Sequence, residues 1–320
     1  MKNSEHLLSI RRNHLDEVLH SGIICATDKN YKFTYKKGST LEKTFLRSCA
    51  KPIQAIPLIN SSSLITNKEL AIICGSHTGS NKHLELIDHL SKKLDINLKN
   101  LHCGIHSPLD TKERTSLLKE NLSPDVRHNN CSGKHLGMLH ACNLNGWTIK
   151  NYTHPNHPLQ QKILKDITTL SQYKNIKMGI DGCSVPTFYL PIENICRLFY
   201  NFKNQSKYTK IFNAMTANPF YVGGKNRIDT EIMRVAKGKI LSKVGAQGLI
   251  ICLKDDGSTL VVKIADGSEL ARSIVTVHML IKLKWLKKTD LENSNLIHLF
   301  NYKVTNLKKK IVGDIKLLLN

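Results

Sequence analysis

Short apolar runs of strand length alternate along this chain with longer amphipathic segments, and this alternation limits the folds it can form. Residues 22–27 and 31–35 are two such runs, separated by the turn residues 28–30, and they predict a β-hairpin. Residues 248–253 and 259–265 repeat the pattern far along the chain. Because the strand-like runs come from both chain ends, we expect an α/β fold of the α+β type, with a central antiparallel sheet flanked by helices.

Apolar side chains spaced three or four residues apart predict amphipathic helices, because such positions share one helix face. The segments with this spacing are 82–94, 134–142, 159–170 and 269–286. Residues 50–58 have a spacing that suits a helix, but prolines at positions 52 and 57 interrupt it. The chain has no internal repeat and no Pro/Ser-rich linker, so we expect residues 1–320 to form a single domain.

The formal net charge of +22 raises the question of an anionic partner. The basic clusters are scattered, and aromatic residues do not alternate with them as they do on single-strand-binding surfaces. The sequence contains no zinc-finger, helix-turn-helix or RNA-recognition signature. We interpret the charge as a lysine-rich solvated exterior and expect no nucleic-acid partner, although a basic nucleic-acid-binding protein stays open as an alternative of another class.

The apolar runs and the cysteines indicate the compartment. No run reaches the roughly 20 residues of a membrane span, and the start of the chain lacks a secretory signal. The nine cysteines are an odd number without a CxxC pair, and most stand in apolar stretches. We therefore expect a cytoplasmic protein with buried, reduced thiols and no membrane partner.

The segment RSCAKPIQA, residues 47–55, contains the first candidate site. Ser48 and Lys51 stand three positions apart and would share one face of a helix that begins at the serine. Serine becomes a nucleophile only beside a base, and a lysine can serve when burial or nearby positive charge lowers its pKa. The alternative is a capping serine followed by an exposed lysine, since the pattern alone is common by chance.

The loop GSHTGSNKH, residues 75–83, follows a short apolar run and precedes an amphipathic helix. Small residues and hydroxyl groups crowd this turn. The loop could therefore present Ser80 and backbone N–H groups to a bound oxygen atom. The alternative is an ordinary loop in which Ser80 or Asn81 caps the helix.

Cys131 and Cys183 differ from the other cysteines, because polar and small residues surround them in NNCSGKHLGM and DGCSVP. Two thiolates brought together by folding could bind zinc, with a third donor and a water or substrate completing the coordination. The alternative is two unrelated loop cysteines, because they stand 52 positions apart.

Lys263 lies inside an apolar strand-like run and shares a face with Val261 and Ala265. This placement raises the possibility of an inward-facing lysine, although exposed strand lysines are commoner. The adjacent Gly223 and Gly224 could let the backbone approach a ligand closely or form a tight turn before a helix.

These segments, in this order, resemble the bacterial asparaginase II family, the rhizobial-type or class 3 L-asparaginases. The matching segments are 47–55, 74–83, 103–109 (CGIHSPL), 130–138, 157–160 (HPLQ), 181–186, 218–230, 245–248 (GAQG) and 263–267 (KIADG). The resemblance implies a catalytic domain that cleaves L-asparagine to L-aspartate and ammonia, and it suggests a homodimer. It also implies a fold similar to serine β-lactamases, penicillin-binding proteins and bacterial glutaminases.

The resemblance assigns two Ser–Lys pairs to catalysis. The pairs are Ser48 with Lys51 and Ser80 with Lys263. We expect one lysine to deprotonate Ser48, which attacks the side-chain amide carbon, and water to hydrolyse the acyl-enzyme after ammonia leaves. Backbone N–H groups near Ser48 and the Ser80 loop would stabilise the oxyanion.

The resemblance also implies a zinc site and a set of substrate contacts. The implied zinc ligands are Cys131, Lys134 and Cys183, completed by water. The implied substrate contacts are Arg47, His135 and Asp181. We expect the zinc to orient the substrate, because the serine already supplies a nucleophile. The chain departs from the family at Gln247, where the family generally has glutamate, and the loss could weaken recognition of the substrate amino group.

Two further functions stay open. One is a glutaminase or another SxxK serine hydrolase, since asparagine and glutamine differ by one methylene group, worth about 1–3 kcal/mol in a pocket. A penicillin-recognising enzyme is less favoured, because SDN and KTG motifs are not evident. The other is a zinc-binding protein without catalysis.

Overall fold

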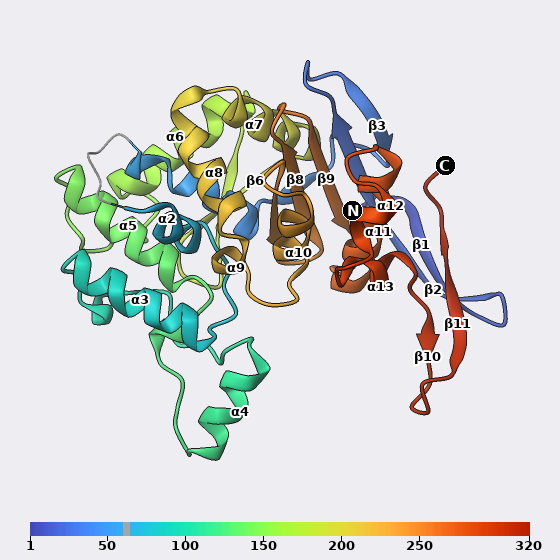
Figure 1. Cartoon of the computed structure of the whole chain (residues 1–320). Helices are drawn as coiled ribbons and strands as arrows, with labels where there is room; N and C mark the ends of the chain where they lie inside the picture. Colours follow the sequence, from blue (N-terminus) through green and yellow to red (C-terminus); the bar gives the residue numbers. More distant parts are fainter. Residues whose placement is uncertain (60–64) are drawn as a thin grey trace.

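The computed structural model describes residues 1–59 and 65–320, and a curled antiparallel sheet forms its centre (Figure 1). The strand order is β10 (Val304–Thr305), β11 (Ile311–Leu317), β1 (Glu5–Arg12), β2 (Leu15–Thr27), β9 (Thr259–Ile264), β8 (Leu249–Lys254) and β7 (Ile240–Gly245), with β3 (Phe33–Lys37) paired to β2 beside this path. Neighbouring strands all run antiparallel. Strands from both chain ends lie side by side, which confirms the predicted central sheet and mixed α/β class.

The central strands are buried on both faces, which explains their continuous apolar sequences. In β9, Val261 packs into one hydrophobic cluster, while Leu260 and Val262 pack into a second cluster on the opposite face. α7 (Ile192–Lys203) contributes to the first cluster and α11 (Glu269–Lys282) to the second. The sheet therefore separates two cores.

The predicted hairpins and amphipathic helices are present with shifted ends. The hairpins are β2–β3 and β8–β9, and the helices are α3 (Asn81–Lys93), α5 (Ser132–Leu144), α6 (Pro158–Ser171) and α11. α11 ends before its predicted limit, because Lys284 adopts a left-handed backbone with φ of 58°. The predicted helix over 50–58 is wrong as a single element. That stretch divides among η1 (Arg47–Ala50), α1 (Lys51–Gln54) and η2 (Ile56–Leu58). Proline is the second residue of each of the last two elements.

A mostly helical layer stands beside the sheet and holds a second, three-stranded sheet (Figure 1). The small sheet contains β4 (Lys43–Phe45), β6 (Pro186–Pro191) and β5 (Lys177–Ile180). The elements of the chain not yet named, in this layer or against the central sheet, are α2 (Asn67–Ile73), η3 (Leu98–Asn100), α4 (Thr111–Lys119), η4 (Val126–His128), η5 (Ser206–Tyr208), α8 (Thr209–Ala217), α9 (Pro219–Val222), α10 (Ile228–Val235), α12 (Lys288–Leu291) and α13 (Leu296–Phe300). α4 projects away from the body and buries none of its residues (Figure 1).

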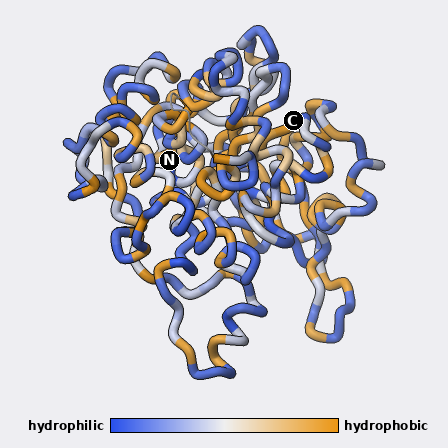
Figure 2. The backbone as a smooth tube through the Cα atoms, turned by 60° about the vertical axis from the view of Figure 1, so that its left-hand side comes forward, coloured by the Kyte–Doolittle hydropathy of each residue, from blue (hydrophilic) through white to orange (hydrophobic). Residues whose placement is uncertain are grey.

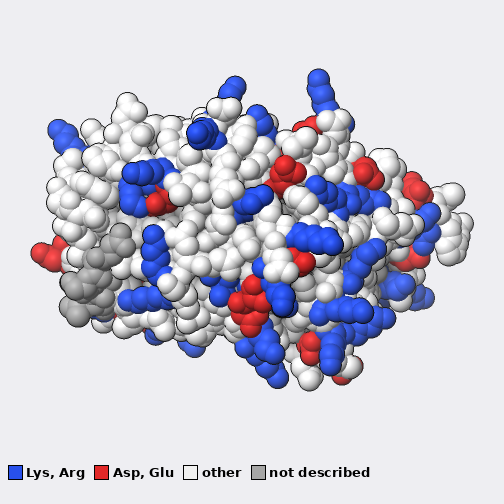
Figure 3. Space-filling view, turned by 90° about the horizontal axis from the view of Figure 1, so that it is seen from above, with Lys and Arg blue, Asp and Glu red and all other residues white. Residues whose placement is uncertain are grey.

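The distribution of residue types agrees with the composition. Hydrophobic positions gather inside the body of the molecule (Figure 2). All nine cysteines are buried and free, as predicted. Lysines and arginines are scattered over the face in Figure 3, with acidic residues among them. No helix within residues 1–59 and 65–320 is long and apolar enough to cross a membrane.

The close approach of β2 and β9 gives a stability prediction at Gly22. A Cβ atom at this position would lie 2.3 Å from the backbone oxygen of Lys263. We expect Gly22→Ala to lower the free energy of unfolding by about 1–3 kcal/mol, because the sheet backbone must shift. Urea denaturation measures this change. Gly182→Ala is the control, since its Cβ meets nothing within 4 Å; equal stability of the two variants would contradict the close packing.

Candidate active site

Ser48 lies on a short helical turn that follows β4 and packs against the edge strand β7. The turn η1 continues into α1 at Lys51, because Ala50 between them has right-handed helical dihedral angles. The Ser48 side chain is half-buried, and its hydroxyl makes no hydrogen bond within the described parts of the chain. The hydroxyl is therefore not engaged as a helix cap, which was the alternative interpretation.

Lys51 is 1% exposed, so the expected alternative of a solvated lysine is wrong. Its Nζ donates to the carbonyl oxygen of Gly75, to Ser76 Oγ at 2.9 Å and to the carbonyl oxygen of Asn130 at 3.1 Å. Three acceptors match the three hydrogens of a protonated lysine amine. Lys51 thus joins α1 to the 75–80 loop and to the segment that leads into α5.

Lys243 is a second buried lysine near the turn η1, and it is not among the predicted site residues. It lies on β7 with none of its surface exposed, and its carbonyl oxygen accepts from Cys49 Sγ at 3.1 Å. Its Nζ donates to the carbonyl oxygen of Val244 at 2.8 Å and lies 3.6 Å from Asp229 Oδ2. Strand β7, which carries this lysine, packs against the turn that carries Ser48.

Burial lowers the pKa of the Lys243 amine to about 8, against the opposing effect of the Asp229 carboxylate. The nearby Lys51 lowers this pKa further. A signal for Lys243 exists in the sequence, because it is a charged residue inside the apolar run ILSKVG.

Lys263 faces inward, as its strand alternation suggested, and is 7% exposed. Its Nζ donates to the carbonyl oxygens of Gln247 at 2.7 Å and Ile264 at 2.6 Å. No hydrogen bond joins Lys263 to Ser80 in the described chain, so the structure does not bring this predicted pair together. The Gln247 side chain is exposed in the turn between β7 and β8, where its φ is 60°.

Ser80 occupies the N-cap position of α3 and pairs with a histidine. Its Oγ lies 2.7 Å from His83 Nδ1, and His83 Nε2 lies 3.0 Å from the carbonyl oxygen of Phe220. Because that carbonyl can only accept, Nε2 carries the hydrogen and Nδ1 accepts from the Ser80 hydroxyl. Burial lowers the pKa of His83 to about 4, so the ring is neutral near pH 7.

Two cysteines and a lysine converge although they lie far apart in the sequence. Lys134 Nζ donates to Cys183 Sγ at 2.8 Å, and the Cys183 thiol interacts with that of Cys131. Cys131 immediately precedes α5, whose first turn holds Lys134, and Cys183 lies in the turn between β5 and β6. All three residues are buried. The alternative of two unrelated loop cysteines is therefore wrong.

The donor set of this cluster fits zinc in part. The hydrogen bond from Cys183 lowers the pKa of the Cys131 thiol well below its usual range, and the Lys51 and Lys134 charges lower it further. A thiolate is the form that binds zinc. Residues 1–59 and 65–320 contain no group of three His, Cys, Asp or Glu residues that could hold a metal. A metal here therefore needs the Lys134 amine as its third protein ligand.

The three expected substrate contacts lie near this cluster. Arg47 and Asp181 form an ion pair, with Nε and Nη2 at 2.9 Å and 2.8 Å from Asp181 Oδ1. His135 is fully buried, and its Nδ1 lies 2.6 Å from the Tyr152 hydroxyl. His135 Nε2 has no partner among the described residues. Burial lowers the pKa of His135 well below its usual value, so this ring is neutral.

Solved structures provide one comparison. The chain is similar to a candidate β-lactamase from Bacteroides dorei DSM 17855, with a TM-score of 0.46, 11% identity, and coverage of 81% of this chain and 93% of that one. It is also similar to a β-lactamase from Mycobacterium bovis, with a TM-score of 0.42, 12% identity, and coverage of 83% and 95%. No curated protein sequence matches the chain.

The sequence itself provides the second comparison. The profile of the L-asparaginase II family matches residues 8–317, which is nearly the whole chain. This match includes every residue of the site described above. The chain therefore belongs to the L-asparaginase II family.

Proposed function

We propose that this protein is an amidohydrolase that converts L-asparagine to L-aspartate and ammonia, with Ser48 as the nucleophile. The observation that carries the proposal is the pair of buried lysines, Lys51 and Lys243, beside the turn that holds Ser48. Membership of the family supports the substrate class. Two amines with different hydrogen-bond environments suit a reaction that needs one base and one fixed positive charge.

Lys243 is the base in this proposal, because its pKa of about 8 leaves a useful neutral fraction near pH 7. Its amine takes the Ser48 proton, and the serine oxygen attacks the side-chain amide carbon of asparagine. The carbon–nitrogen bond then breaks, and the nitrogen leaves as ammonia with the proton from Lys243. Water attacks the resulting ester and gives a proton to the same amine, which returns it to Ser48 as aspartate leaves.

Lys51 supplies a fixed positive charge rather than a base. Its three acceptors hold the amine in place beside the 75–80 loop. The loop ends at Ser80, whose hydroxyl His83 orients. We infer that Ser80 donates to the substrate amide or contacts the leaving nitrogen, with His83 as a positioning residue.

The cluster of Cys131, Lys134 and Cys183 would hold one zinc ion, with a water or substrate atom as the remaining ligand. The Lys134 amine must be neutral to offer a lone pair, so zinc binding releases its proton. When bound, zinc would supply positive charge that orients the substrate. The Arg47–Asp181 pair would accept the α-carboxylate and α-ammonium groups of asparagine, since it offers one group of each charge.

Ser48→Ala tests the nucleophile. We expect this variant to release ammonia from L-asparagine at least about 1000-fold more slowly than the wild type, because the ester cannot form. An ammonia assay beside L-glutamine measures both the loss and the substrate preference. Ser116→Ala is the matched control, since Ser116 is exposed on α4, and it should keep full activity. Equal rates in both variants would refute the assignment.

The pH profile tests the base. Neutral Lys243 is the active form, so kcat/KM should rise with pH through a midpoint near 8. Asp229→Asn removes the carboxylate that raises this pKa, so the midpoint should move to lower pH. Asp256→Asn, which removes an ion pair with Lys254 on a hairpin turn, should leave the midpoint unchanged. A midpoint that moves to higher pH in Asp229→Asn would exclude Lys243 as the base.

Elemental analysis tests the metal cluster. We expect the wild type to hold about one zinc per chain and Cys183→Ser to hold almost none, because serine lacks the soft thiolate. Cys142→Ser serves as the control, since Cys142 is also buried and lies on the same helix as Lys134. Zinc content that is equal in both variants, or absent from the wild type, would overturn the site.

A further inference from the structure

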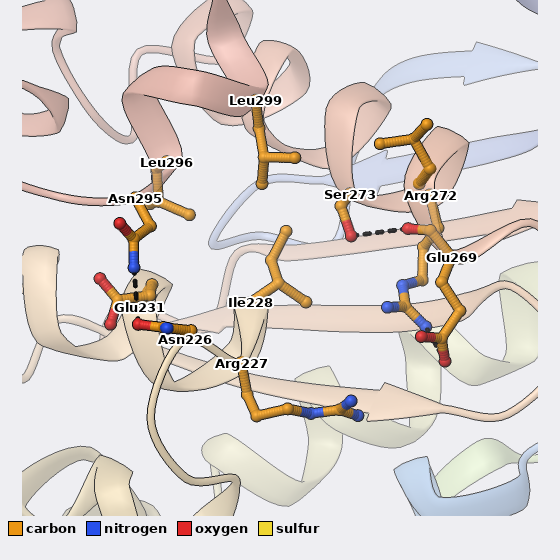
Figure 4. A pocket seen from close by; sticks show the side chains of 11 residues that line it. Asn226, Arg227, Ile228, Glu231, Glu269, Arg272, Ser273, Asn295, Leu296 and Leu299 are labelled. Carbon is orange, nitrogen blue, oxygen red and sulfur yellow. Dashed lines mark hydrogen bonds and ion pairs between the residues drawn. The ribbon is translucent and has the colours of Figure 1, made fainter. Parts of the chain in front are cut away.

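A cavity of about 260 Å³ borders the second hydrophobic cluster (Figure 4). It opens between the start of α10, the first turn of α11 and helix α13. Ile228, Leu296 and Leu299 form an apolar wall, and the first two belong to the second hydrophobic cluster. The cavity is therefore separate from the residues assigned to catalysis, which border the first cluster.

Arg272 lines this cavity and lacks adequate partners. It is 2% exposed, yet its Nε and Nη1 make no hydrogen bond to any described residue. The nearest carboxylate oxygen is Glu269 Oε1, 3.6 Å from Nη1, and the Glu269 side chain is 65% exposed. A buried guanidinium without acceptors is strongly unfavourable, so such a group calls for an anion.

A second arginine adds to the positive charge of the cavity. Arg227 Nε is buried and also has no hydrogen-bond partner among the described residues. In Figure 4 the Arg227 guanidinium extends toward the side of the cavity that holds Arg272 and Glu269. The two arginines therefore offer several unused N–H donors to the same end of the cavity.

The acidic residues nearby do not use the free N–H groups of these arginines. Glu231 also lines the cavity, but its carboxylate pairs with Arg234 at 2.7 Å. The Asp229 carboxylate faces Lys243 and the backbone N–H of Val244. The charges of Arg227 and Arg272 also act on Asp229, but no hydrogen bond joins either arginine to it among the described residues, so their N–H groups stay free for an anion.

We propose that this cavity binds a small aliphatic carboxylate, a ligand distinct from the substrate bound at Ser48. The carboxylate would accept hydrogen bonds from Arg272 and Arg227, since a guanidinium matches a carboxylate with two parallel bonds. The hydrocarbon part of the ligand would lie against Ile228, Leu296 and Leu299. A fully polar anion such as phosphate fits this apolar wall less well.

Isothermal titration of the full chain with sodium butyrate tests the proposal. We expect saturable binding of about one butyrate per chain in the millimolar range and no binding of neutral butyramide. Arg272→Lys keeps the charge but loses the two-pronged geometry, so it should bind at least about tenfold more weakly. Glu269→Gln removes the competing carboxylate at an exposed position and should bind more tightly.

Two controls locate the binding. Arg12→Gln, at an exposed ion pair on β1, and Arg47→Gln, in the catalytic site, should both bind butyrate as the wild type does. Loss of binding in Arg47→Gln but not in Arg272→Lys would place the carboxylate at the catalytic site and overturn the proposal. Absence of binding at about 50 mM butyrate would also overturn it, since the cavity would then hold water only.

Discussion

The site is built around two lysine amines that are buried on elements packed against the turn that carries Ser48. Removing a charged amine from water costs several kcal/mol unless the protein replaces the lost hydrogen bonds. Lys51 has three oxygen acceptors, whereas Lys243 has one carbonyl oxygen and a carboxylate at 3.6 Å. Burial lowers the pKa of the poorly satisfied amine of Lys243 to about 8. This difference in environment is the basis for the different roles that we propose for the two lysines.

Asp229 connects this pair to the other side of the sheet edge. It is fully buried, and its carboxylate accepts from the backbone of β7 and faces the Lys243 amine. The charge of Arg272 acts on the same carboxylate from the side of the cavity. The first turn of α10 therefore supports the catalytic strand and closes one wall of the proposed carboxylate site.

Particular residues show what the sequence can predict. Strands β8 and β9 were predictable because apolar runs with a turn between them can form little else. β1 and β11 were not, since both are partly exposed and mix apolar residues with charged ones. Alternation along β9 raised the possibility that Lys263 faces inward, but it could not decide against an exposed lysine or predict its partners. A period of two fixes the face of a strand, whereas contacts depend on which strands become neighbours.

The clusters of the site show the same limit. Cys131 and Cys183 stood out by their polar neighbours, and the resemblance to a family joined them to Lys134. The pairing of Ser80 with His83 was not predicted. Two residues three positions apart at a helix start are explained equally well as an ordinary cap. Lys243 was missed because its strand was not recognised as an element. Only the packing of β7 against η1 gives that lysine a role.

Detection of the covalent intermediate tests the central claim most directly. The protein is mixed with L-asparagine, quenched in acid within the first turnover and digested. Mass spectrometry then measures the mass of the peptide that contains Ser48. If Ser48 is the nucleophile, its peptide carries an added aspartyl group that disappears as the substrate is consumed. An adduct on Ser80 instead, or ammonia release without any adduct, would contradict it.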